Sequence, residues 1–126
     1  MTELWKIEAA DALLSPDAVV EALRARTADE LLETWLTSSS GRSLAVVSNT
    51  VRAMVVLLER DGDPGEHAVD PQAEEDAWSD GFVLSNGQDD AYPDRDTVPV
   101  EEAYRLVTHL VDTGHWPPDA HWVAER

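Results

Sequence analysis

A long amphipathic helix in the last third of the chain constrains the fold most. Pro99 suits the first turn of a helix because its φ is fixed, and Gly114 followed by Pro117-Pro118 ends it. Between these limits, apolar residues recur at the spacing of one helical face. They are Val100, Ala103, Tyr104, Val107, Leu110 and Val111. The sequence therefore predicts a helix that is closed at both ends and buries this face.

Asn86-Gly87 predicts a β-hairpin before this helix. Both central residues of a type I′ turn need positive φ, which Asn and Gly adopt at least cost. We expect one strand to end at Ser85 and another to begin near Gln88. The returning limb then carries four acids, which are Asp89, Asp90, Asp94 and Asp96.

Short apolar runs predict the other strands. Alternation over residues 4–9 places Trp5 and Ile7 on a buried face. The runs 43–48 and 51–58 are aliphatic and nearly continuous, which indicates central strands that are covered on both faces or packed under a helix layer.

Two further helices are predicted near the N-terminus. Ser15-Pro16-Asp17 is typical of a helix start and precedes an apolar segment that extends to about Ala25. Thr27 and Glu30 fit a capping box. The apolar stripe behind this box is Leu31, Leu32, Trp35 and Leu36. Residues 72–81, which are acidic around Trp78, are expected to form a loop.

The order of these elements favours an α+β fold. Strands and helices follow one another without regular alternation, and 126 residues suffice for one core. We expect a single domain over residues 1–126, with a mainly antiparallel sheet flanked by about three helices. Arg52, at the start of a central strand, is expected to be exposed, and Trp122 to anchor a short extended segment at 120–124.

The net charge of the chain limits the kinds of partner that it can bind. The chain has 26 acidic and 9 basic side chains, a net charge of −17, which repels nucleic acid and anionic membranes and attracts basic partners. Residues 59–102 contain 15 of the acids but only two bases, Arg60 and Arg95. There are no cysteines, and the first residues do not resemble a signal peptide. We expect a cytoplasmic protein that binds neither nucleic acid nor membrane.

The acids of the predicted loop and hairpin are the candidate partner-binding residues. Like charges placed side by side repel each other, so an external partner is one way to compensate them. The candidates are Glu74, Glu75, Asp76, Trp78, Asp80, Asp89, Asp90, Asp94 and Asp96. The competing interpretation is a solvated face that confers solubility. Trp78 is either an interface anchor or a ring folded back onto the core, and general burial favours the second.

No catalytic or metal motif stands out. His115, Asp119 and His121 are the only cluster of ligand type, but they lack the spacing of a helical zinc motif, which favours a structural interpretation. The acidic loop 61–66 lacks the pattern of a calcium loop. We therefore expect no metal, no cofactor and no enzymatic activity.

Residues 44–122 resemble a known family, immunity protein family 1 of the bacterial polymorphic toxin systems, common in actinobacteria. The resemblance rests on ordered turn, helix and tryptophan positions. These are Arg52-Ala53, Gly62, Gly65, Asn86-Gly87, Tyr92-Pro93, Val98-Pro99-Val100, Ala103, Thr113-Gly114, Pro118 and Trp122. It implies a small cytoplasmic α+β protein that binds and neutralises a cognate toxin domain, often a nucleic-acid deaminase or nuclease. It provides no catalytic residues to transfer.

Charge and resemblance lead to the same hypothesis. A toxin that acts on nucleic acid needs a basic substrate groove, and an acidic surface is suited to cover it. Two alternatives remain open: an intracellular acidic adaptor or regulatory subunit for a basic partner that is not a toxin, and a small metal-dependent enzyme. The sequence assigns neither the toxin nor an oligomeric state.

Overall fold

The computed structural model describes residues 3–8 and 13–125 of the 126-residue chain. Its helices are α1 (Pro16–Ala28), the short 3-10 helix η1 (Asp94–Asp96) and α2 (Val100–Thr113). Its strands are β1 (Trp5–Ile7), β2 (Leu13–Leu14), β3 (Glu33–Ser38), β4 (Ser43–Ser48), β5 (Arg52–Leu58), β6 (Glu66–Ala68), β7 (Trp78–Val83), β8 (Asp89–Pro93), β9 (Val98–Pro99) and β10 (Trp122–Ala124). Neither described α-helix is long and apolar enough to cross a membrane.

The main sheet is antiparallel, which confirms the predicted α+β class. Seven of its eight strands follow the order β10-β6-β5-β4-β3-β1-β2, and β9 pairs with β5. β5 pairs with β9 through Arg52 and Ala53, and with β6 through Val56 and Leu57. The amide of Val100 donates to the carbonyl of Val51 at 3.0 Å, so α2 begins directly from the edge of the sheet.

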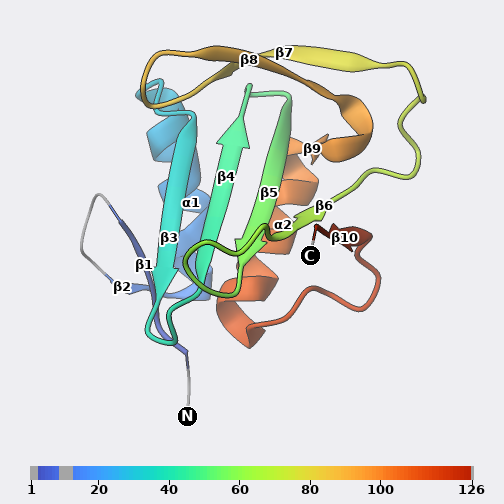
Figure 1. Ribbon diagram of the computed structural model, residues 1–126. Coiled ribbons are helices and arrows are strands. Elements are labelled where there is room, and N and C mark those ends of the chain that lie inside the picture. The colour runs from blue at the N-terminus through green and yellow to red at the C-terminus, as the bar shows by residue number, and fades with distance from the viewer. Residues whose placement is uncertain (1–2, 9–12, 126) are drawn as a thin grey trace.

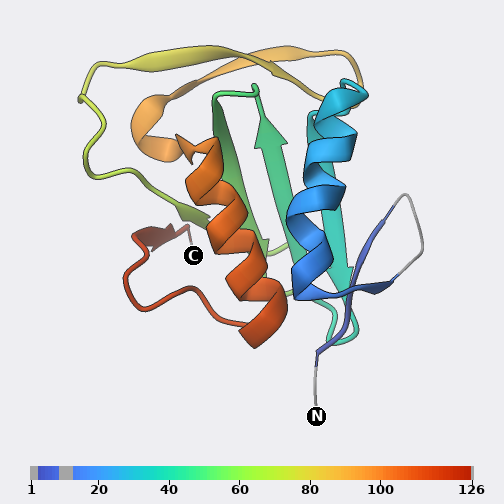
Figure 2. The ribbon, with the colours of Figure 1, turned by 180° about the vertical axis from the view of Figure 1, so that it is seen from behind.

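Both α-helices cover one face of this sheet (Figure 2). Alternate residues of β5 point to this face and are buried, namely Ala53, Val55 and Leu57. α2 contributes the predicted stripe and also Leu106, which is buried in the same cluster. Trp5 and Ile7 are buried in it as well, as the sequence predicts. Burying a Leu or Val side chain contributes about 1.5–3 kcal/mol, so this interface carries most of the stability.

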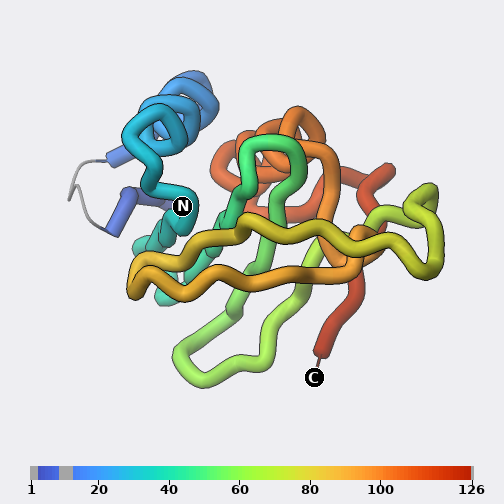
Figure 3. Tube along the Cα trace, turned by 90° about the horizontal axis from the view of Figure 1, so that it is seen from above, coloured from blue at the N-terminus to red at the C-terminus, as the bar shows by residue number. Residues whose placement is uncertain are grey.

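A second, smaller sheet lies across one end of the main one. β7 and β8 pair only with each other, and in Figure 1 they run across the ends of β3, β4 and β5. Figure 3, from above, shows both strands crossing the main sheet along almost their whole length. Phe82 of β7 is fully buried but lies outside the main core cluster. The two-stranded unit is therefore held to the domain by contacts of its own.

The prediction of a second helix that begins at Thr27 is wrong. α1 continues to Ala28, and the stripe residues Trp35 and Leu36 belong to strand β3, which pairs with both β1 and β4. Glu30 has a φ of 62° and ends α1 in the left-handed region. The amide of Glu30 donates to the carbonyl of Thr27, and that of Leu31 to the carbonyl of Arg26, which is a Schellman stop without glycine.

Two details of the hairpin also differ from prediction. In Asn86-Gly87 only Gly87 has positive φ, at 88°. The amide of Leu84 donates to the carbonyl of Gln88 at 2.8 Å, and that of Gly87 to the carbonyl of Leu84 at 2.9 Å. This is the longer hairpin connection with a left-handed glycine rather than a type I′ turn. The predicted loop over residues 72–81 is also too long, because β7 begins at Trp78.

Candidate functional site

The structure pairs the two acidic segments that the sequence singled out. Trp78 lies opposite Pro93 and Val83 opposite Asp89 in the β7–β8 ladder. Residues 74–96, from the turn before β7 to the end of η1, are called the acidic ribbon below. The acidic ribbon contains eight carboxylates and one basic residue, Arg95. Segments separated in sequence thus form one continuous acidic surface.

Residues that point away from the domain form the outer face of the acidic ribbon. Trp78, Asp80 and Val83 are exposed on β7, and Asp89 is exposed on β8. The turn before β7 adds three exposed acids, Glu74, Glu75 and Asp76. Trp78 is 63% exposed, so its ring is not folded back onto the core, contrary to the burial expected for it.

The inner face of the acidic ribbon is aromatic. The rings of Phe82 and Tyr92 meet edge to face, with centroids 5.0 Å apart. The hydroxyl of Tyr92 donates to Asp90 Oδ2 at 3.0 Å. Burial, followed by this hydrogen bond and the charge of Asp90, raises the pKa of Tyr92 to about 12. The phenol therefore stays protonated and acts as a fixed donor.

Three of the candidate acids have structural partners. Asp94 accepts a hydrogen bond from the hydroxyl of Ser79 at 2.6 Å. Asp96 Oδ1 lies 3.1 Å from Nε2 of His67, and Asp90 is held by Tyr92 as described above. These three acids are half-buried, so their charges contribute to the fold.

The other predicted residues remain available to a partner. Within the described part of the chain, five of the eight candidate acids form no side-chain hydrogen bond or ion pair: Glu74, Glu75, Asp76, Asp80 and Asp89. Together with Trp78 they make up six of the nine candidates. The candidate site is therefore the outer face of the acidic ribbon rather than all of its acids.

The acidic ribbon is attached to the main sheet near its middle and at its hairpin. Near its middle, Asn49 Nδ2 donates to the carbonyl of Asp80 at 2.8 Å. At the hairpin, the amide and hydroxyl of Ser85 both donate to Glu33 Oε1 at 2.8 Å. The Ser85 amide, together with the indole N–H of Trp35, lowers the pKa of Glu33. The outer face is thus presented on a rigid support, which suits a binding surface.

Arg52 is the contributor that sequence reasoning missed. Its side chain is 16% exposed, whereas an exposed position was expected. It pairs with Asp70 at 2.7 Å and donates to the carbonyl of Asp94 at 3.1 Å. A lone arginine at the start of an otherwise aliphatic strand was the available signal, because a cation there needs nearby acceptors.

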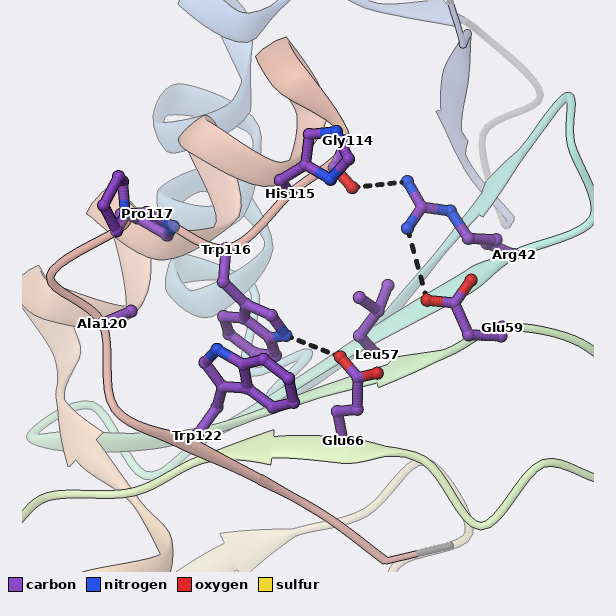
Figure 4. Close-up of a pocket in the computed structure, with 11 residues that line it drawn as sticks. Arg42, Leu57, Glu59, Glu66, Gly114, His115, Trp116, Pro117, Ala120 and Trp122 are labelled. Carbon is purple, nitrogen blue, oxygen red and sulfur yellow. Dashed lines mark hydrogen bonds and ion pairs between the residues drawn. The ribbon is translucent and has the colours of Figure 1, made fainter.

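A separate pocket lies between α2 and the β5–β6 edge (Figure 4). The indole N–H of Trp116 donates to Glu66 Oε1 at 2.8 Å, and Trp122 stacks on Trp116 with ring centroids 6.0 Å apart. Trp122 thereby anchors β10, as predicted. Arg42 lines the pocket and donates to the carbonyl of Gly114 at 2.8 Å. These contacts attach the C-terminal segment to the core.

The predicted ligand-type cluster is not brought together. Within the described part of the chain, no three His, Asp or Glu side chains are placed to hold a metal ion. Instead, Asp119 lies 3.2 Å from the guanidinium of Arg105 on α2. His115 and His121 are both exposed.

No protein-family model matches the chain, and no curated protein matches it. The resemblance to immunity proteins therefore stays a prediction, and the functional argument depends on the geometry and charge of the acidic ribbon.

Proposed function

We propose that this protein is an immunity protein that binds and neutralises a cognate toxin domain with a basic surface. The observation that carries the proposal is the outer face of the acidic ribbon. It carries five carboxylates without partners in the described residues and the exposed ring of Trp78. An aromatic residue among unpaired charges of one sign is suited to a protein partner of opposite charge.

Charge supports the choice of partner. A net charge of −17 produces a field that repels nucleic acid and raises the encounter rate with basic proteins. The outer-face acids lie side by side on one ribbon, where their mutual repulsion is destabilising. A basic partner removes that repulsion on binding, so the affinity should depend on how well the charges of the two surfaces match.

Inhibition follows from occupancy of the toxin. Toxins that modify or cut nucleic acid need a basic groove for the phosphate backbone. A rigid acidic ribbon that enters such a groove competes with the substrate for the same Lys and Arg side chains. This mechanism requires no catalytic residue, metal or cofactor in the inhibitor.

The proposal predicts an adjacent gene for a protein with a C-terminal toxin domain, and the test is binding to that domain. The two proteins are co-expressed with an affinity tag on the toxin, and the purified complex is titrated by calorimetry. We expect a one-to-one complex, and growth of cells that express both proteins. An acidic adaptor for another basic protein predicts neither outcome. Cells that die despite a stable complex would also overturn the proposal.

A charge-removal series tests which surface is used. Asp80→Asn with Asp89→Asn should weaken binding by tenfold or more, since these carboxylates face the partner. Glu21→Gln with Glu101→Gln removes the same charge from exposed helical positions and should leave binding within about twofold. Equal effects of the two pairs would show that only net charge matters.

A further inference from the structure

The face of the main sheet that the helices leave uncovered is apolar at its centre. On β5, Met54, Val56 and Leu58 point away from the buried residues Val55 and Leu57 and are half-buried. On β4, Ala45 lies opposite Val56 and Val47 opposite Met54. Ala45 and Val47 are themselves buried, each 4% exposed, so the accessible part of this face is Met54, Val56 and Leu58 with Trp35 of β3; these four side chains are called the open face below. No described helix covers it (Figures 1 and 2).

A hollow of about 270 Å³ lies on the open face beside the acidic ribbon. Met54 and Val56 line it from the sheet, and Tyr92 lines it from the ribbon. Pro64 and Gly65, in the β5–β6 loop, close another side. Gly65 has a φ of 96°, and a Cβ there would lie 2.7 Å from Leu58 Cδ2, so only glycine lets the loop lie this close to β5. The hollow is thus a defined feature of the fold.

The polar side of this hollow is acidic. Asp96 and Glu125 both line it, and both pair with the ring of His67, at 3.1 and 3.2 Å. One imidazole carries at most one positive charge, so it compensates at most one of the two carboxylates. This side of the hollow is therefore net negative. An apolar centre with an acidic edge fits a partner that is apolar at its contact and basic around it.

We infer that the open face is the apolar centre of the toxin interface and that the hollow receives an apolar or aromatic side chain flanked by Lys or Arg. This inference rests on the proposed function. A sheet that is apolar on both faces normally has both covered, and the helices cover only one. Tyr92 lines the hollow from the inner face of the acidic ribbon, so the hollow lies beside the ribbon. Asp96 of the ribbon and Glu125 then act as the charged rim of the interface, and the open face as its desolvated centre.

A second copy of this chain is a poor occupant. Face-to-face pairing of two open faces would join two chains that each carry a net charge of −17. Like charges across an interface strongly disfavour association. A basic domain replaces that repulsion by attraction, which is why the inference commits to the toxin.

The experiment measures binding of variants to the toxin domain that the proposed function predicts to be encoded beside this gene. Met54→Ser with Val56→Thr removes the apolar surface without changing charge, and should raise Kd by tenfold or more, mainly through faster dissociation. Leu13→Ser is the matched control, because Leu13 is 66% exposed at the far edge of the sheet. It should leave Kd within about twofold, since isolated exposed apolar residues seldom matter.

A second variant tests the same inference in case the double substitution prevents folding. Met54→Lys places a cation at the hollow, where strands tolerate a half-buried lysine stem. It should weaken toxin binding by tenfold or more with a cooperative melting transition retained. Asp112→Asn changes the net charge by the same amount from an exposed site on α2 and should bind as the wild type does. Circular dichroism melting checks every variant.

The outcomes separate the two hypotheses. Wild-type protein that fails to bind the toxin overturns the proposed function, and this inference with it. Wild-type binding that survives in both Met54 variants overturns the inference alone and leaves the acidic ribbon as the interface. A dimer in sedimentation analysis that Met54→Lys dissociates overturns it as well, because the open face would then bind a second copy. Selective loss in the Met54 variants, but not in the controls, supports it.

Discussion

Arg52 Nη2 lies 2.7 Å from Asp70 Oδ2, and this ion pair joins β5 to the segment that precedes the acidic ribbon. Arg52 also donates to the carbonyl of Asp94 and, through Nε, to the hydroxyl of Thr97 at 2.7 Å. Asp94 is the first residue of η1 and Thr97 follows its last, and Thr97 is fully buried. One side chain therefore connects the sheet to both ends of the acidic ribbon.

Arg52→Ala should lower the free energy of unfolding by about 2–4 kcal/mol, because it leaves Asp70 half-buried without its partner. Urea denaturation measures the change. Arg24→Ala is the control, since the Arg24–Glu101 pair is exposed at both ends, with side chains 58% and 74% accessible. Such pairs contribute at most about 1 kcal/mol. Equal losses in the two variants would contradict the role of Arg52.

Local signals were sufficient to predict α2 but not the end of α1. At α2, the apolar stripe, the proline start and Gly114 with a φ of 81° all agree. At α1, Glu30 adopts the left-handed stop that usually selects glycine, and only backbone hydrogen bonds stabilise it. Trp35 and Leu36 then join a strand because β1 and β4 pair on both sides. Such pairings between distant segments cannot be predicted from the residues of one short segment.

The candidate site was predictable in composition but not in orientation. The acids could be counted in the sequence, but the partners of two of them come from other strands: Asp94 accepts from Ser79 of β7, and Asp96 pairs with His67 of β6. Trp78 was expected to fold back, yet strand alternation places it on the outer face. The open face was missed because the same aliphatic run in β5 supplies both faces of the sheet.

Leu106→Ala tests the assignment of the core. Leu106, on the buried face of α2, is 1% exposed, whereas Leu13 is 66% exposed, so the same substitution meets two environments. We expect Leu106→Ala to lower the free energy of unfolding by about 2–5 kcal/mol, because it leaves a cavity. Leu13→Ala should cost less than about 1 kcal/mol. Similar melting temperatures for the two variants would show that α2 packs by another face.

Acid stability should depend on Glu3. Burial raises the pKa of Glu3, but hydrogen bonds from Arg42, Ser40 and Ser38 outweigh it and lower the pKa to about 2. A carboxyl with a depressed pKa stabilises the fold above its unfolded value of 4.5, and that contribution is lost as pH falls toward about 2. Denaturation between these pH values should show a shallower decline for Glu3→Gln than for the wild type. Glu21→Gln, at an exposed site of α1, should decline as the wild type does.

Association with a basic toxin should depend on salt. Raising ionic strength from about 0.1 M to about 1 M shortens the Debye length from about 10 Å to about 3 Å, which removes long-range attraction. We expect the association rate constant, measured by stopped flow, to fall by tenfold or more. Asp80→Asn with Asp89→Asn should reduce this salt dependence, whereas Glu21→Gln should alter it little. A rate constant that does not respond to salt would exclude electrostatic steering.

Trp78→Ala separates a binding role of the outer face from a role in folding. The ring is 63% exposed, so its removal should change the free energy of unfolding by less than about 1 kcal/mol. As an interface anchor it should contribute about 2 kcal/mol or more to toxin binding, a rise in Kd of about 30-fold. Trp122→Ala should instead lower the free energy of unfolding and leave toxin binding unchanged, because Trp122 stacks on Trp116 and lies away from the ribbon. Toxin binding that is unchanged in Trp78→Ala would show that the outer face is a solvated surface.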